Sequence, residues 1–194
     1  IDHFHDNISD KPTLLDLGTI FHLSGEYDRA IKYNQLLLEK LPPNHSKIPT
    51  LYNNIGSVHN SQGNYIEALN CYNKTLEIRL KYFHENDLSL AITYSNIGSI
   101  YNNQSNYVEA LNYCNRALET RLKLLHENHS SLAITYNNIR SVHKNQGNYV
   151  DALNCYDKAL EIQLKSLPEN HPLLATTYNN IGSMWNNQGN YVEA

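Results

Sequence analysis

Long apolar runs and charge are both scarce in this sequence. Only 18% of its 194 residues are Asp, Glu, Lys or Arg, which is a low share for a soluble protein. No apolar run approaches the roughly 20 residues of a helix that crosses a bilayer, and no cluster of Lys or Arg would hold an anionic membrane. The net charge of −4 also lacks the basic footprint of a nucleic-acid-binding protein. We therefore expect neither a membrane nor a nucleic acid as partner.

Cysteine is scarce as well. The three cysteines are an odd number, and Cys71 and Cys155 lie at equivalent positions of an internal repeat. This arrangement is typical of a packing position in a reducing compartment and not of a disulfide framework, so we expect a cytoplasmic protein. The first ten residues lack the apolar core of a signal peptide. Because the chain starts without Met and stops within a repeat, we expect it to be part of a longer protein.

The motifs that usually carry catalysis are missing. There is no glycine-rich phosphate loop, no nucleophile elbow and no Cys/His pair at a plausible spacing. The acidic residues Glu67, Glu109 and Asp151 recur in register, which is typical of a structural surface. None of the ten histidines forms an H-x3-H pair with a third ligand. These absences predict a non-catalytic protein without a metal or a cofactor.

What the sequence does contain is an internal repeat of 42 residues. A fixed period of this length indicates an array of stacked supersecondary units. Two positions set its register, namely Gly56, Gly98, Arg140 and Gly182 at the first, and Ala68, Ala110, Ala152 and Ala194 at the second.

We expect a polar lead-in over residues 1–11 and a repeat array over residues 12–194. The repeats are predicted at about 14–40, 48–83, 90–125 and 132–167, with an incomplete one at 172–194. The first repeat is four residues shorter than the others, and the loss falls between Ala30 and His45. Because four residues are close to one helical turn, the same helix face stays inward.

Each repeat predicts two helices. In the third repeat an apolar stripe with i, i+3, i+4, i+7 spacing marks the first helix, and a second helix follows from about Tyr107. The position of Ser105, between the two, is a glycine in the other repeats, which predicts a left-handed stop at the end of the first helix. The expected fold class is therefore all-α, an α-solenoid of helix–turn–helix units.

The residues of the third repeat resemble the tetratricopeptide consensus W-x2-L-G-x2-Y followed by A, F and A. The matching positions are Tyr94, Ile97, Gly98, Tyr101, Ala110, Cys114 and Ala117. The longer period and the segments NNIG, QGNY, EAL, KALEI and ENHP resemble the kinesin light chain subfamily over about residues 14–194. The resemblance implies a right-handed superhelix that holds an extended peptide in a concave groove. It also implies a kinesin heavy chain or a cargo adaptor as partner.

The face of each first helix opposite the apolar stripe carries small polar side chains in rows. By resemblance these rows line the groove, and an Asn amide can bond both the N–H and the C=O groups of a peptide. The alternative is that the asparagines only form a solvated face. The candidate peptide-binding residues are Asn53, Asn54, Ser57, Asn60, Asn96, Ser99, Asn102, Asn137, Asn138, Ser141, Lys144, Asn179, Asn180 and Asn186, and the same rows include Ser95 and Ser183.

Two basic residues depart from these patterns. Lys144 is the only cation in the rows, which argues against a ligand held by its terminal carboxylate and against acidic cargo peptides. Arg140 replaces the packing glycine of its repeat. We interpret it as a substitution that loosens the repeat, so that Arg140→Gly is predicted to raise the melting temperature. The alternative is that its side chain reaches the edge of the groove.

Two other functions compete with a peptide-binding scaffold. The short first repeat resembles arrays that lie downstream of ADP-ribosyltransferase domains, so the chain could be the regulatory array of a larger enzyme. Oligomerisation through the last helix, near Trp185, is the other alternative.

Overall fold

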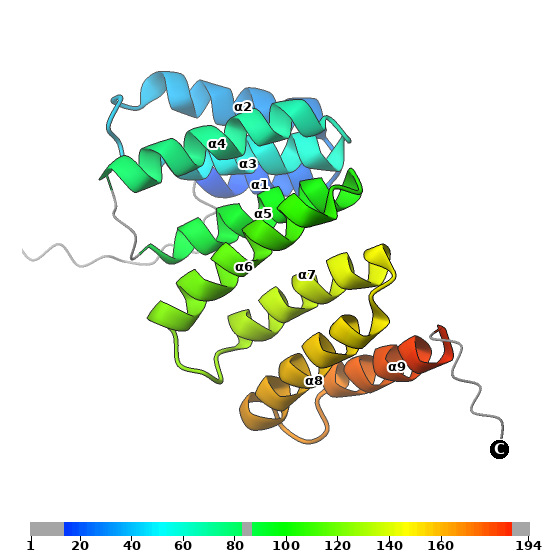
Figure 1. Ribbon diagram of the computed structural model, residues 1–194. Helices are drawn as coiled ribbons and strands as arrows, with labels where there is room; N and C mark the ends of the chain where they lie inside the picture. Colours follow the sequence, from blue (N-terminus) through cyan, green and yellow to red (C-terminus); the bar gives the residue numbers. More distant parts are fainter. Residues whose placement is uncertain (1–13, 83–86, 188–194) are drawn as a thin grey trace, which may run out of the picture. The chain divides into compact units, whose positions relative to one another are not determined.

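The computed structural model describes residues 14–82 and 87–187, and every regular element in these ranges is an α-helix (Figure 1). The all-α prediction is thereby confirmed for the described residues. The expected lead-in and residues 188–194 lie outside them. The helices are α1 (Leu14–Leu23), α2 (Tyr27–Lys40), α3 (Ile48–Ser61), α4 (Tyr65–Tyr82), α5 (Leu88–Asn103), α6 (Tyr107–Leu124), α7 (Ser130–Gln146), α8 (Tyr149–Ser166) and α9 (Pro172–Asn187).

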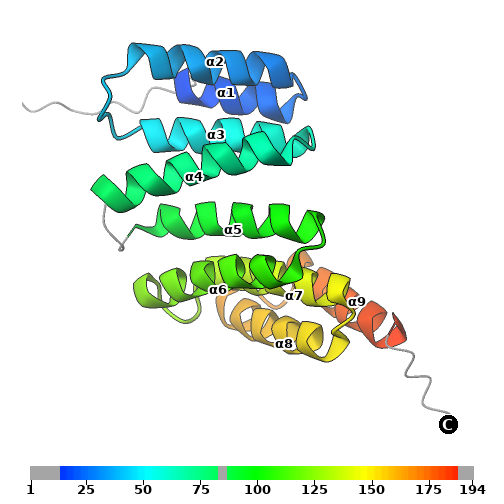
Figure 2. The same ribbon diagram turned by 45° about the horizontal axis from the view of Figure 1, so that its top comes forward.

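The chain divides into two compact bodies, residues 1–75 and residues 76–194, and the division falls within α4. In the N-terminal body α1 packs on α2, and α3 contacts both of them. In the C-terminal body α5 pairs with α6 and α7 pairs with α8, while α7 also packs against α6 and α5 (Figure 2). The helix α9 contacts α8. Within each body, two first helices of successive repeats therefore touch each other directly, α1 with α3 and α5 with α7.

The short first repeat has a short second helix. Helix α2 contains 14 residues, whereas the equivalent helices α4, α6 and α8 each contain 18. The missing four residues correspond to about one turn, which is the size of the deletion expected from the sequence.

Small residues allow the two helices of a repeat to approach closely. A Cβ atom built on Gly98 of α5 would lie 2.8 Å from the Cys114 sulfur and 3.2 Å from the carbonyl oxygen of Ala110, both on α6. Ala110 itself is fully buried. A side chain at position 98 would push α5 and α6 apart, so this glycine permits the close packing of the two helices.

The first helices end in the predicted left-handed conformation. Gly25, Gly63 and Gly147 have φ angles of +77°, +76° and +83°. Ser105 has a φ of +59° at the equivalent position, although a side chain disfavours this region of backbone space. Gly189 lies outside the described residues.

Buried polar contacts join one repeat to the next. Arg121 of α6 is 7% exposed and donates hydrogen bonds to Ser95 of α5, at 3.3 Å, and to Thr135 of α7. In the following repeat the equivalent residue is Gln163, whose side-chain oxygen accepts a hydrogen bond from Thr177 of α9 at 2.8 Å. Ser95 was expected in an open polar row, but it is 8% exposed. That expectation is wrong because the Ser95 hydroxyl accepts a hydrogen bond from Arg121 in the buried contact between the two repeats.

Candidate peptide-binding surface

All fourteen candidate residues lie on the first helices of their repeats. They differ in exposure, and the side chain of Asn186 is not among those that the structure describes. Half-buried are Asn53, Asn54, Ser57, Asn60, Asn96, Asn102, Asn137, Asn138 and Ser141, whereas Ser99, Lys144, Asn179 and Asn180 are exposed.

Four of the candidates come together in the C-terminal body. Ser99 and Asn102 of α5 and Asn138 and Ser141 of α7 line one cavity, whose floor includes Cys114. The cavity has a volume of about 60 Å³. Since a water molecule occupies about 30 Å³ in the liquid, it holds about two waters and is too small for most side chains. A ligand would therefore lie across its polar mouth.

Asn102 occupies the centre of this arrangement. Its carbonyl oxygen accepts a hydrogen bond from the Asn145 amide of α7 at 3.1 Å, and its own amide nitrogen lies 3.5 Å from the Ser141 hydroxyl. In the N-terminal body His22 and Ser61 occupy the equivalent pair of positions, and their side chains are hydrogen-bonded at 2.9 Å. In each body the last turns of two successive first helices are thus joined by side chains, which gives Asn102 a structural role.

No pattern in the sequence singled out Asn145, His22 or Ser61. Each of them lies in the last turn of a first helix, but their bonds reach a different repeat, 39 or 43 residues away. A periodicity argument assigns a residue to a face and does not assign its partner. A comparison of the row that contains Asn102 with the adjacent row that contains Asn145 could have suggested that the two side chains meet.

The α3 candidates have different surroundings. The hydroxyl groups of Ser57 and Tyr72 are hydrogen-bonded at 3.1 Å, so Ser57 is engaged with α4 of its own repeat. Burial raises the pKa of Tyr72 above its ordinary value, in part offset by this hydrogen bond. In the next repeat the residue equivalent to Tyr72 is Cys114, and Ser99 stands exposed at the mouth of the cavity.

Arg140 is engaged with α8. Its Nη1 donates a hydrogen bond to the Tyr156 hydroxyl at 2.6 Å, and its guanidinium carbon lies 4.6 Å from the centre of that ring. The arginine therefore bridges the two helices of its repeat. These contacts differ from the loosening that the sequence suggested.

The chemistry available near this surface is that of hydrogen bonding. Burial raises the pKa of Cys114 to about 11, and burial together with the nearby Asp151 carboxylate raises that of Cys155 to about 11. Both thiols stay protonated near neutral pH and are poor nucleophiles. Within residues 14–82 and 87–187, no three His, Cys, Asp or Glu side chains gather as metal ligands. In the same ranges, no helix has the length and apolar character needed to span a membrane.

With the fold and this surface in view, comparison with known proteins identifies the family. A family model described as Tetratricopeptide repeat matches residues 47–123, 89–139 and 131–194. Because these matches together cover more than half of the chain, the protein belongs to the tetratricopeptide repeat family.

Solved structures share the fold. BtubC (BKLC) from P. vanneervenii superposes with a TM-score of 0.81 at 21% identity, covering 92% of this chain and 72% of that one. A putative kinesin light chain with nearly identical TPR-like repeats, from Podosopora anserina, gives 0.76 at 15% identity, covering 95% and 92%. MamA gives 0.61 at 20% identity, covering 90% and 85%. At these identities the likeness is one of fold.

A curated relative shares a shorter stretch of sequence. Anaphase-promoting complex subunit 6 of Dictyostelium discoideum is 32% identical over 69 residues. The match covers 36% of this chain and 8% of that protein. The similarity is therefore confined to a small part of the relative.

Proposed function

We propose that this chain binds an extended peptide segment of a partner protein across the amide and hydroxyl groups of α5 and α7. Tetratricopeptide repeats are in general non-catalytic scaffolds for protein–protein interaction, and this protein has that fold. The observation that carries the finer proposal is the cavity at which Ser99, Asn102, Asn138 and Ser141 meet.

The ligand's main chain, and not its side chains, would make the central contacts. The cavity of about 60 Å³ leaves a side chain little room, whereas the amide of Asn138 at its mouth can offer a donor and an acceptor to a peptide group. One such hydrogen bond contributes about 0.5–1.5 kcal/mol net. Useful affinity therefore requires several of them, and the rows on α7 and α9 supply further amides.

The chemistry of the surface restricts the ligand class. Lys144 is the single cation among the candidate residues and is exposed. We expect neutral polar groups to make most of the contacts with a ligand at this surface, so its affinity should depend only weakly on its charge. By the resemblance to kinesin light chains, a kinesin heavy chain or a cargo adaptor is the proposed partner. A cytoplasmic location is proposed because Cys71, Cys114 and Cys155 are all free thiols.

Peptides selected from a phage-displayed library on the immobilised chain would test this proposal. We expect Asn138→Ala and Asn96→Ala each to weaken the binding of selected peptides about three- to tenfold, the loss of one net hydrogen bond. The matched controls are Asn112→Ala and Asn154→Ala, which remove exposed asparagines from the second helices α6 and α8. Binding that is unchanged by both groove substitutions, for every selected peptide, would show that this face is inert.

A further inference from the structure

A larger cleft opens elsewhere in the C-terminal body, where the end of α4 meets α5 and α6. It has a volume of about 340 Å³ and shares no lining residue with the cavity between α5 and α7. This volume falls within the range of about 300–1,000 Å³ that is typical of ligand pockets. Its lining includes Leu80, Leu90, Tyr94, Arg116, Glu119 and Lys123.

Part of the lining of this cleft is apolar. Leu90 and Tyr94 of α5 are only 2% and 5% exposed, whereas Leu80 of α4 is 45% exposed and is the apolar side chain that a ligand can reach. An apolar side chain placed on Leu80 would remove exposed hydrocarbon from water on both partners, at about 25 cal/mol per Å² buried. An aliphatic or aromatic side chain of a ligand can therefore pack against Leu80 in this cleft.

Arg116 at the rim is held in one position. Its guanidinium carbon lies 4.2 Å from the centre of the Tyr94 ring and 5.6 Å from that of Tyr113, and its Nη2 donates to the Tyr94 hydroxyl at 2.9 Å. Tyr113 is itself stacked on Tyr101, with ring centres 5.7 Å apart. A guanidinium has five N–H donors, and the bond to Tyr94 uses one of them. Arg116 therefore presents a planar, oriented fork, which matches a carboxylate.

A second cation lies on the same side of α6. Lys123 is seven residues after Arg116, which is two helical turns, and both line the cleft. Lys123 is exposed and forms no ion pair with any residue of the described ranges. Among the described residues of the lining, Glu119 is the acidic one. The described rim therefore favours a partner with negative charge.

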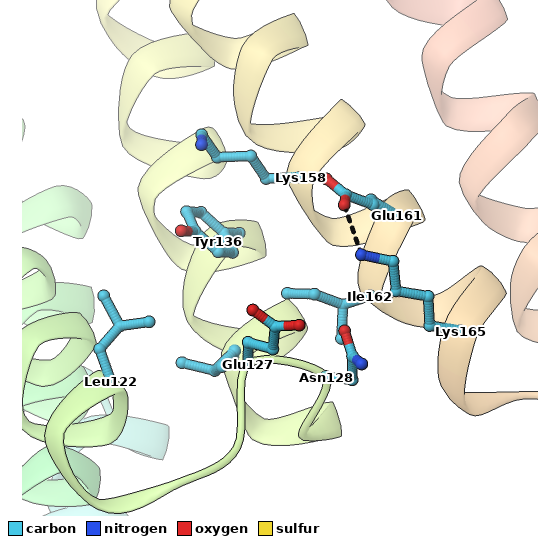
Figure 3. A pocket seen from close by; sticks show the side chains of 9 residues that line it. Leu122, Glu127, Asn128, Tyr136, Lys158, Glu161, Ile162 and Lys165 are labelled. Carbon is cyan, nitrogen blue, oxygen red and sulfur yellow. Dashed lines mark hydrogen bonds and ion pairs between the residues drawn. The ribbon is translucent and has the colours of Figure 1, made fainter.

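The next repeat contains the same cleft in a neutralised form. Forty-two residues further on, Tyr136, Lys158, Glu161 and Lys165 occupy the positions of Tyr94, Arg116, Glu119 and Lys123, around a volume of about 180 Å³ (Figure 3). There Lys165 pairs with Glu161 at 2.7 Å, so its charge is offset within the cleft.

The cation of this second cleft is also less firmly held. Lys158 lies 5.8 Å from the centre of the Tyr136 ring. The position of Tyr113 is taken by Cys155, so the second ring is missing. Of these two equivalent clefts in the described residues, the one at Arg116 combines an oriented guanidinium with a second cation that forms no described ion pair.

We propose that the Arg116 cleft is a docking site for an acidic peptide segment of a partner protein. A carboxylate of the segment bonds the Arg116 fork, an adjacent apolar side chain lies on Leu80 and Tyr94, and Lys123 attracts further negative charge. This site is separate from the peptide-binding surface of α5 and α7. It selects a ligand by its negative charge, whereas that surface binds the neutral main chain of its ligand. A partner could occupy both sites or either one alone.

The probe is a set of fluorescein-labelled ten-residue peptides, each with one leucine flanked by glutamates at varied spacing. A matched set carries glutamine in place of glutamate. By fluorescence anisotropy we expect at least one glutamate peptide to bind, its glutamine counterpart to bind about tenfold more weakly, and binding to weaken as salt is raised. No detectable binding of any glutamate peptide up to about 1 mM, or equal binding of the glutamine set, overturns the proposal.

Variants then locate the site. Arg116→Gln is expected to weaken binding about tenfold, and Arg116→Lys about threefold, because lysine keeps the charge but lacks the fork. Lys123→Gln is expected to weaken binding about threefold. Because Lys123 is exposed, this variant tests the site even if the melting temperatures show that the Arg116 variants fold poorly. Lys158→Gln in the neutralised cleft is the matched control and should leave binding unchanged. A loss with Lys158→Gln as large as with Arg116→Gln, or no loss with Lys123→Gln, overturns the assignment.

This experiment separates the two proposals for this chain. Asn138→Ala should leave the glutamate peptides bound as before, and Arg116→Gln should leave library-selected groove peptides bound as before. If the glutamate peptides lose affinity with Asn138→Ala and not with Arg116→Gln, they bind the α5–α7 surface, and the Arg116 docking site is refuted.

Discussion

Arg140 of α7 donates a hydrogen bond to the Tyr156 hydroxyl of α8 at 2.6 Å, and its guanidinium lies over the ring of the same tyrosine. The other repeats have glycine at this position. In the repeat of Gly56, a Cβ atom would lie 2.8 Å from the ring of Tyr72, the residue equivalent to Tyr156. The fourth repeat has thus replaced close helix contact by a polar bridge.

This bridge reverses the effect that the sequence alone suggests for Arg140→Gly. The substitution removes a hydrogen bond and a cation–π contact, and it places glycine inside a helix, which alone costs about 1 kcal/mol. We expect the free energy of unfolding to fall by about 1–3 kcal/mol and the melting temperature to fall with it.

Urea unfolding monitored by circular dichroism measures the Arg140 effect. In a Tyr156→Phe background, which lacks the accepting hydroxyl, the same substitution should cost less than in the native chain. A higher melting temperature for Arg140→Gly would restore the interpretation that the arginine loosens its repeat.

Ser105 offers a stabilising substitution. It adopts a φ of +59° at the position where Gly25, Gly63 and Gly147 have similar values. Left-handed backbone costs a residue with a side chain about 1–2 kcal/mol, whereas glycine pays more conformational entropy on folding. We expect Ser105→Gly to raise the free energy of unfolding by about 0.5–1 kcal/mol.

Gly63→Ser is the reciprocal control for the stop position, and it should destabilise the chain by a similar amount. Nothing lies within 4 Å of a Cβ atom at Gly63, so the change tests backbone conformation and not steric contact. Equal stability of Ser105→Gly and the native chain would indicate that the turn relaxes around the serine.

Two glycines at equivalent positions should respond oppositely to alanine. At Gly98 the new methyl group would lie 2.8 Å from the Cys114 sulfur, whereas at Gly182 it meets none of the described residues within 4 Å. We expect Gly98→Ala to destabilise the chain by about 1–3 kcal/mol because the helices must separate. Gly182→Ala should be neutral or stabilising by up to about 1 kcal/mol, since alanine favours helix more than glycine. Thermal unfolding of both variants tests this, and equal effects would argue against close packing at Gly98.

Asp87 predicts an acid-dependent loss of stability. Burial alone would raise the pKa of Asp87, but the hydrogen bond from the Ser89 backbone N–H at 2.8 Å and the Arg79 guanidinium at 2.6 Å outweigh it, so the pKa lies below its ordinary value. A carboxyl group whose pKa is lowered by folding stabilises the fold when the pH is above its pKa in the unfolded chain, which is about 3.9. That contribution is lost as the pH falls through the folded value.

Asp87→Asn keeps a side chain able to cap α5 but removes the ion pair with Arg79. We expect it to lower the free energy of unfolding at pH 7 by about 1 kcal/mol, with the difference from the native chain shrinking below about pH 4. Urea titrations from pH 7 to pH 2.5 measure this. Asp157→Asn, at an exposed site on α8, should leave the pH profile unaltered. A constant difference between Asp87→Asn and the native chain at all pH values would contradict the ion-pair account.

Much of the architecture could be predicted from local patterns. The apolar stripe through Tyr94 and Ile97 indicated helix α5, and the glycine positions indicated where the first helices end, including the left-handed Ser105. These features depend on residues within one or two turns of each other. The packing role of Gly98 also followed from its spacing to Ala110 across one short turn.

The state of each polar residue could not be predicted in the same way. Ser95 and Asn96 are neighbours on α5, yet the first is buried by Arg121 and the second is half-buried in the candidate surface. A rotation of 100° per residue separates their directions but does not say which groups of α6 and α7 approach each of them.

The sequence by itself determined the 42-residue period, the helical pairs and the family, because helix formation and the left-handed stops are set by residues close together in the chain. Only the tertiary structure decided which side chains meet across repeats, such as Asn102 with Asn145 and Arg121 with Thr135. It also decided that the Arg116 guanidinium lies near two tyrosine rings beside an open cleft. Such contacts join residues that are 14 to 43 positions apart in the chain, and their distances come from the packing of the helices against one another.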